Sequence, residues 1–236
     1  MKIIDAHLHF SVCEGFDRSA EAAGHRNTAE SLKGAFDARS IVLGIVMGEM
    51  GGERIDGVAT PRLPNRPLPD FLVFCAGLES RELDPQTLDR SLELFETEFR
   101  KPDCVGLKLY PGYNSVPLND PLHAPFLELA EQYDLPVVIH TGELAGTHGL
   151  LKFSHPLNVD ELAVRHPDLR IVMAHYGNPW IVDATAVAQK NPNVYLDLSG
   201  FAEGNYTSQE FLKKYRLHLD YVRQWLVYLD HYEKVL

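Results

Sequence analysis

The 236-residue sequence contains only three cysteines, and no two of them form a CxxC pair. Cys75 and Cys104 lie in apolar segments, so we expect them to be small buried side chains in a reducing compartment. No segment approaches a transmembrane helix, which needs about 18 consecutive apolar residues. Asp5, His7 and His9 interrupt the N-terminus where the apolar part of a signal peptide would lie. We therefore expect a cytoplasmic protein that does not associate with membranes.

Positive charge is scarce as well. The 22 Lys and Arg residues against 33 Asp and Glu residues give a formal net charge of −11, and the sequence contains no basic run. Because nucleic acids attract basic surfaces, we expect no nucleic-acid partner. Hydrophobic residues make up 45% of the chain and charged residues 23%, close to the averages of folded domains. This composition argues against disorder, collagen and coiled coil.

Two catalytic signatures are also absent. No GxGxxG sequence follows a predicted strand, which argues against a dinucleotide site. No serine stands in a GxSxG sequence, which argues against the triad of an α/β-hydrolase. The chemistry therefore has to come from other residues.

The sequence alternates short apolar, β-branched runs with longer amphipathic segments. Nearly continuous apolar runs are typical of parallel strands that are covered on both faces. The repeat of roughly 33 residues indicates right-handed βαβ units, so we predict an α/β fold, a TIM-like (β/α) barrel formed by a single domain over residues 1–236. The predicted strands are 3–10, 41–47, 71–78, 105–110, 136–141, 170–175 and 194–198.

Helical patterns lie between these strands. Asn158 and Glu161 resemble the capping pair of a helix that Pro167 would end. Thr207 and Glu210 form a capping box at the start of the last predicted helix, which should run to about residue 231. The other predicted helices are 28–39, 84–99 and 121–133.

The length of the chain accommodates seven of these units. Eight would need roughly 265 residues, so we expect a barrel that lacks its eighth strand or is truncated before it. Residues 234–236 then begin an eighth strand. Because an open barrel leaves strand edges unpaired, we also expect a homo-oligomer. A fragment of a longer reading frame is the alternative.

Four histidines stand at the ends of predicted strands. His7 and His9 are two residues apart, so both side chains point to the same side of an extended segment. His140 and His175 end the fifth and sixth strands. Because the C-terminal ends of barrel strands meet at one mouth, we expect the four imidazoles to converge there. Neutral imidazole binds zinc, manganese, iron and nickel, so the sequence predicts a divalent metal, zinc foremost.

Four short motifs carry a resemblance to a known family. They are DAHLH at 5–9, GLKLYP at 106–111, HTG at 140–142 and AHYG at 174–177. In order and spacing they resemble the amidohydrolase superfamily of metal-dependent barrel enzymes, and most of all its amidohydrolase 2 branch. That branch includes hydrolases and non-oxidative decarboxylases.

The resemblance implies a role for each strand-end histidine. His7, His9 and His140 would be the metal ligands, and His175 would be the catalytic residue next to them. The family also has an aspartate at the end of strand eight. Asp197 ends the seventh predicted strand and does not correspond to that position, and no other residue of this sequence does.

We expect Lys108 and Tyr110 to bind substrate. Lys108 lies on the fourth predicted strand, and Tyr110 is its last residue. Lys108 has two functional interpretations under the resemblance: a salt bridge to a substrate carboxylate, or a carboxylated lysine that bridges two metals. Its third interpretation is a stem packed at the barrel mouth with the ammonium group in water.

These features predict a metal-dependent hydrolase that acts on a small carboxylate or carbonyl compound. A metal-activated water would attack a lactone, amide or ester, and His175 would serve as base. Non-oxidative decarboxylation is the alternative within the superfamily. A degenerate barrel that binds metal without catalysis is the alternative outside enzymes.

Overall fold

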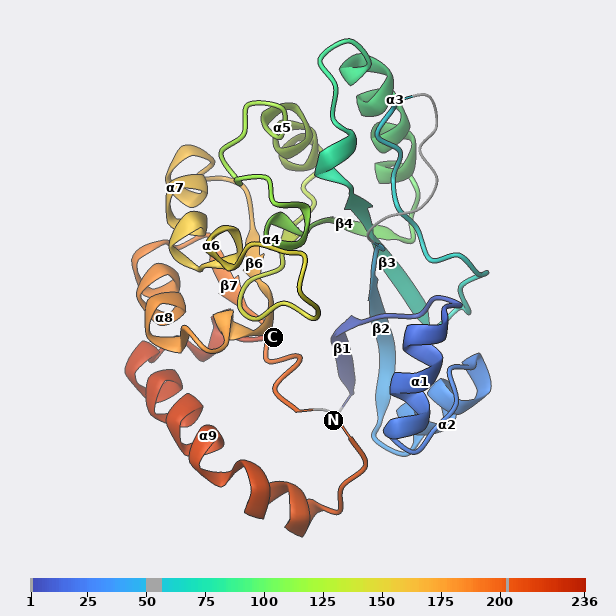
Figure 1. Cartoon of the computed structure of the whole chain (residues 1–236), viewed down its shortest axis with the longest axis vertical. Helices are drawn as coiled ribbons and strands as arrows, with labels where there is room; N and C mark the ends of the chain where they lie inside the picture. The colour runs from blue at the N-terminus through green and yellow to red at the C-terminus, as the bar shows by residue number, and fades with distance from the viewer. Residues whose placement is uncertain (1, 50–56, 203) are drawn as a thin grey trace.

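Seven parallel strands form one curled sheet in the computed structural model, which describes residues 2–49, 57–202 and 204–236 (Figure 1). Each strand pairs in parallel with the next one along the chain. Helices surround the sheet, which confirms the predicted TIM-like (β/α) architecture. The strands are β1 (Ile3–Leu8), β2 (Ile41–Met47), β3 (Leu72–Leu78), β4 (Cys104–Leu109), β5 (Val137–Ile139), β6 (Ile171–Met173) and β7 (Val194–Leu196).

The two ends of the sheet are not joined by a strand ladder. In the described residues, β1 pairs only with β2. On the other side, Val235 forms a single parallel bridge with Leu196, and the Leu236 N–H donates to the Leu196 carbonyl at 2.8 Å. The strand start predicted at 234–236 is therefore confirmed for Val235 and Leu236, which lie next to β7, whereas Lys234 belongs to a 3₁₀ turn.

The last three strands are shorter than predicted and end at Ile139, Met173 and Leu196, and the chain turns sharply after β6. His175 and Tyr176, after β6, have left-handed φ angles of 62° and 48°. The hydroxyl of Thr141, after β5, donates to the carbonyl of Ala174 at 2.6 Å. These turns end the ladder at Ile139 and Met173 and direct the following side chains toward the mouth of the barrel.

The longer helices cover the outer face of the sheet (Figure 1), whereas α4 and η2 carry residues that line the mouth of the barrel, and several elements were not predicted from the sequence patterns. The Asn158 capping prediction is wrong, because α7 begins at Leu157 and Asn158 lies inside its first turn. The Asn158 amide donates instead to the carbonyls of Lys152 and His155. The elements are α1 (Glu14–Ala22), α2 (Ala29–Asp37), η1 (Ser80–Glu82), α3 (Leu88–Phe99), α4 (Pro111–Asn114), α5 (Ala124–Gln132), α6 (Leu151–Ser154), α7 (Leu157–Arg165), η2 (Ala174–Gly177), α8 (Ile181–Lys190), α9 (Ser208–Leu229) and η3 (Tyr232–Lys234).

The capping box predicted for α9 is confirmed. The Thr207 hydroxyl accepts from the Glu210 N–H at 3.3 Å, and the Glu210 carboxylate accepts from the Thr207 N–H at 2.9 Å. The helix ends at Leu229, two residues before the expected end, because Asp230 turns into the left-handed region with φ 51°.

Apolar side chains fill both sides of the sheet. The larger core lies between the sheet and the helices, and Cys75 and Cys104 are buried and free, as expected. No helix in the described ranges is long and apolar enough to cross a membrane. A smaller cluster fills the interior of the barrel and consists of Met47, Cys75, Val138, Val172 and Ala174.

Replacing Thr207 by Ala removes the cap of α9 and should lower the free energy of unfolding by about 1 kcal/mol. Urea denaturation measures this change. Ser208→Ala is the matched control, because Ser208 is exposed and makes no side-chain hydrogen bond in the described structure. Equal stability of the two variants would contradict the role of the capping box.

Candidate functional site

The four strand-end histidines predicted from the sequence lie together at the mouth of the barrel. The ring centroids of His140 and His175 are 4.8 Å apart, and those of His7 and His175 are 4.9 Å apart. His9 lies 5.7 Å from His7, is exposed to the cavity, and stacks on Phe16 at 5.2 Å. The curling of the sheet thus brings β1 next to the ends of β5 and β6.

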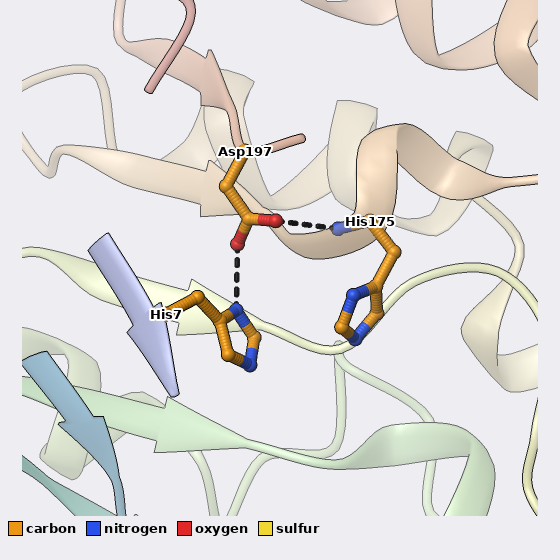
Figure 2. A group of neighbouring side chains, drawn as sticks. All are labelled: His7, His175 and Asp197. Atoms are coloured by element: carbon orange, nitrogen blue, oxygen red, sulfur yellow. Dashed lines mark hydrogen bonds and ion pairs between the residues drawn. The ribbon is translucent and has the colours of Figure 1, made fainter. Parts of the chain in front are cut away.

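Asp197 also belongs to this cluster, although its sequence position suggested no role. Its Oδ2 accepts a hydrogen bond from His7 Nδ1 at 2.7 Å, and its Oδ1 accepts from the His175 N–H at 2.8 Å (Figure 2). The two side chains of the Asp197–His7 pair are 3% and 4% exposed. A sequence signal did exist: Asp197 follows the buried run of β7 directly, as His175 follows that of β6.

The Asp197 carboxylate is ionised in this setting. Burial raises its pKa, but the hydrogen bonds from His7 and from the Ser199 hydroxyl outweigh burial and lower the pKa below its usual range. The same carboxylate holds the left-handed turn at His175, because it accepts the N–H of that residue. Asp197 therefore orients two of the histidines, one through the ring and one through the backbone.

Hydrogen-bond partners determine which ring nitrogen carries the proton in three of the imidazoles. His175 Nδ1 lies 3.2 Å from the Ser199 carbonyl oxygen, and His140 Nε2 lies 2.9 Å from the Glu143 carbonyl oxygen. Because a carbonyl oxygen only accepts, these nitrogens donate. In the neutral rings, His175 Nε2 and His140 Nδ1 are then without a proton. His7 Nδ1 donates to Asp197, and its Nε2 has no hydrogen-bond partner in the described structure.

All three rings are neutral near pH 7. Burial lowers the pKa of His175 to about 4, with Lys108 and His7 adding to the effect. Burial, again with Lys108, lowers the pKa of His7 and brings that of His140 well below its usual value. The cluster therefore presents unprotonated nitrogens, which is the form that binds metals.

The positions of these nitrogens fit a divalent cation. His175 Nε2 and His140 Nδ1 are 3.2 Å apart, and without a proton between them they cannot hydrogen-bond. Two nitrogens at the zinc–nitrogen distance of a tetrahedral site lie about 3.3 Å from each other. One ligand atom from each of His7, His175 and Asp197 also lies within 4.8 Å of the others.

Lys108 and Tyr110 lie below and beside the histidines. Lys108 is fully buried, so the interpretation with its ammonium in water is wrong. Its Nζ lies 5.0 Å from the Tyr110 ring centroid and has no hydrogen-bond partner in the described structure, and burial lowers its pKa to about 8. The Tyr110 hydroxyl donates to the Gly48 carbonyl at 2.6 Å, which leaves the ring to line the cavity.

A cavity of about 800 Å³ opens over the cluster. The four histidines, aromatic rings and two glutamates line it, and no Lys or Arg is among the described lining residues. Besides the histidines, its wall includes Phe16, Glu49, Tyr110, Tyr113, Glu143, Asn178, Ser199, Phe201 and Tyr215.

The amidohydrolase family model matches residues 4–226 of this chain. The chain belongs to the amidohydrolase family. Protein fluG from Emericella nidulans is 28% identical over 148 residues, which are 61% of this chain. The match covers only 16% of the length of that relative.

Solved structures share the fold at low sequence identity. An uncharacterized TIM-barrel protein from Bordetella bronchiseptica has a TM-score of 0.60 and 18% identity, over 91% of this chain and 81% of that one. An amidohydrolase from Burkholderia multivorans with bound zinc has a TM-score of 0.56 and 17% identity, over 94% of this chain and 79% of that one. These likenesses confirm the TIM-barrel architecture.

The lowered histidine pKa values predict that the metal-free protein loses stability as the pH falls. The pKa of His175 is about 4 in the folded chain and 6.5 ordinarily, so between these values the unfolded chain binds a proton that the folded site excludes. His7 and His140 shift in the same direction. We expect the Tm of chelator-treated protein, followed by circular dichroism, to fall from about pH 7 to about pH 4.

Two variants test the origin of this pH dependence. His175→Gln should weaken it, whereas replacement of the exposed His148 by Gln should leave it as in the wild type. A Tm that stays constant across this pH range would contradict the argument.

Proposed function

We propose that this protein is a metal-dependent hydrolase that acts on a small compound with a carbonyl or carboxylate group, such as a lactone, amide or ester. Its divalent metal, zinc foremost, is held by His7, His9 and His140. The observation that supports the proposal is the cluster of neutral imidazoles at the barrel mouth, in which His7, His140 and His175 present unprotonated nitrogens close to one another. Bound there, the metal would supply Lewis acidity that polarises a substrate oxygen.

The other residues of the site orient the metal ligands and supply the proton acceptor. Asp197 holds His7 with its Nε2 unprotonated, and the Glu143 carbonyl does the same for Nδ1 of His140. His175 keeps an unprotonated Nε2 at the cavity wall and would accept the proton of the attacking water. The Ser199 hydroxyl lies 2.8 Å from His175 Nδ1 and also contacts Asp197, so it links the base to the carboxylate.

Substrate binding is proposed for Lys108 and Tyr110, as the sequence suggested. The Tyr110 ring forms part of the cavity wall and offers an apolar face. Lys108 lies beneath the site, and at neutral pH its ammonium is mostly charged. Since its Nζ has no hydrogen-bond partner in the described residues, it would attract negative charge on a substrate oxygen that reaches the floor of the cavity.

Asp197→Asn should lower zinc affinity by about 10- to 100-fold, because an amide in place of the carboxylate no longer holds His7 as firmly in the metal-binding tautomer. Competition titration against a chromophoric chelator measures this. His140→Ala should weaken zinc binding more strongly, and Asp168→Asn, on the exposed surface, should not change it. Zinc binding by Asp197→Asn that equals the wild type would overturn the assigned role.

His175→Gln should retain zinc and lose turnover by about 100- to 10,000-fold, because it removes the proton acceptor. The assay is a panel of lactones, amides, esters and aromatic carboxylates, with hydrolysis and CO₂ release followed separately, and His148→Gln serves as the control. Loss of zinc by His175→Gln would show that His175 is a metal ligand. Unchanged turnover would refute the role of His175 as the base. CO₂ release without hydrolysis would show that the reaction is decarboxylation and not hydrolysis.

A further inference from the structure

Acidic side chains are the only charged groups among the described residues that line the cavity, because the histidine rings there are neutral. They are Glu49 and Glu143. Lys108 is buried underneath and is not part of the wall. Glu143 is exposed, and its backbone carbonyl is engaged with His140. Glu49 is the half-buried carboxylate of the pair.

The backbone that carries Glu49 is held rigidly at the end of β2. The Gly48 N–H donates to the Cys75 carbonyl at 2.8 Å, and the Gly48 carbonyl accepts from Tyr110. A Cβ at Gly48 would lie 2.2 Å from the Gly77 nitrogen, so only glycine allows this close approach of β2 to β3. The place of Glu49 in the cavity wall is therefore determined by the sheet.

The Glu49 carboxyl group is incompletely paired. Its Oε1 is buried and has no hydrogen-bond partner at normal geometry in the described structure, and the nearby Ser11 hydroxyl offsets only part of the effect of burial on the carboxyl pKa. Burial raises the pKa of Glu49, which shows that the charged form is poorly solvated there. Burial raises the pKa of the neighbouring Tyr110, and the charge of Glu49 adds to this effect.

A ligand would change this situation in one of two ways. A hydroxyl or amino group in the cavity donates a hydrogen bond to the part of the carboxylate that lines the wall and stabilises its charge. A carboxylate placed there adds a like charge in a poorly solvated place, and no Lys or Arg in the described wall offsets it. The two kinds of ligand are therefore separated by the sign of their interaction with Glu49.

We propose that Glu49 determines substrate specificity: it selects small compounds that present a hydroxyl or amino group to the β2 side of the cavity, and it rejects those that present a second carboxylate there. This rests on the proposed function, in which the histidine cluster holds the reacting end of the substrate. Two observations support the proposal. The Glu49 carboxylate is partly unpaired, and no basic residue is among the described residues of the cavity wall.

The experiment uses four matched probes: benzoate, meta-hydroxybenzoate, meta-aminobenzoate and isophthalate. Their affinities for the full zinc-loaded chain are measured by calorimetry. We expect the hydroxyl and amino probes to bind about 10-fold more tightly than benzoate, since a hydrogen bond to a charged group is worth about 1.5 kcal/mol. Isophthalate should bind more weakly than benzoate.

Variants assign this preference to Glu49. In Glu49→Ala the four affinities should become nearly equal. In Glu49→Gln isophthalate should regain the affinity of benzoate, because the charge is gone, while part of the hydroxyl preference remains. Glu128→Gln, on the exposed face of α5, is the control and should keep the wild-type order. Thermal melts confirm that each variant is folded.

Three results would overturn the inference: failure of the donor-bearing probes to bind more tightly than benzoate, isophthalate binding as tightly as they do, or the wild-type order persisting in Glu49→Ala. Zinc content is determined separately before each titration. A chain that takes up no zinc refutes the proposed function, and the same probe series on that metal-free chain still decides the role of Glu49.

Discussion

The hydrogen bond from His7 Nδ1 to Asp197 connects the two ends of an open sheet. In the described residues no ladder joins β1 to β7, yet these strands bring the two side chains within 2.7 Å of each other in a buried place. The contact orients the His7 ring and leaves its Nε2 free. Through its second oxygen, Asp197 also holds the left-handed turn that presents His175. One carboxylate thus connects the geometry of the sheet to that of the site.

Burial gives the same cluster its chemical character. Imidazoles that stand together in water would titrate near their ordinary pKa, but here burial and the ammonium group of Lys108 keep them neutral. Carbonyl and carboxylate acceptors then decide which nitrogen of each ring is bare. The unprotonated nitrogens face one another without a hydrogen bond between them, an arrangement whose repulsion a cation would relieve.

Much of the fold could be predicted, because each strand is a local apolar run and each strand-end histidine follows such a run. The prediction for β2 agrees with the structure at both ends, and the capping box of α9 lies where the residues indicated. The Asn158 cap failed, because the chain before α7 is shaped by contacts that this amide makes with the preceding turn. Asp197 received no role, because its contact with His7 joins residues 190 positions apart.

The sequence by itself determined the strand order and the convergence of the histidines at the C-terminal ends of the strands, since these follow from hydrophobic periodicity and spacing along the chain. Its four short motifs carried the family resemblance. Only the tertiary structure decided the partner of His7, the bare nitrogen of each imidazole, the burial of Lys108 and the incompletely paired carboxylate of Glu49. These properties depend on distances between residues far apart in the chain and on the exclusion of water around them. The curvature of the sheet determines both these distances and the exclusion of water.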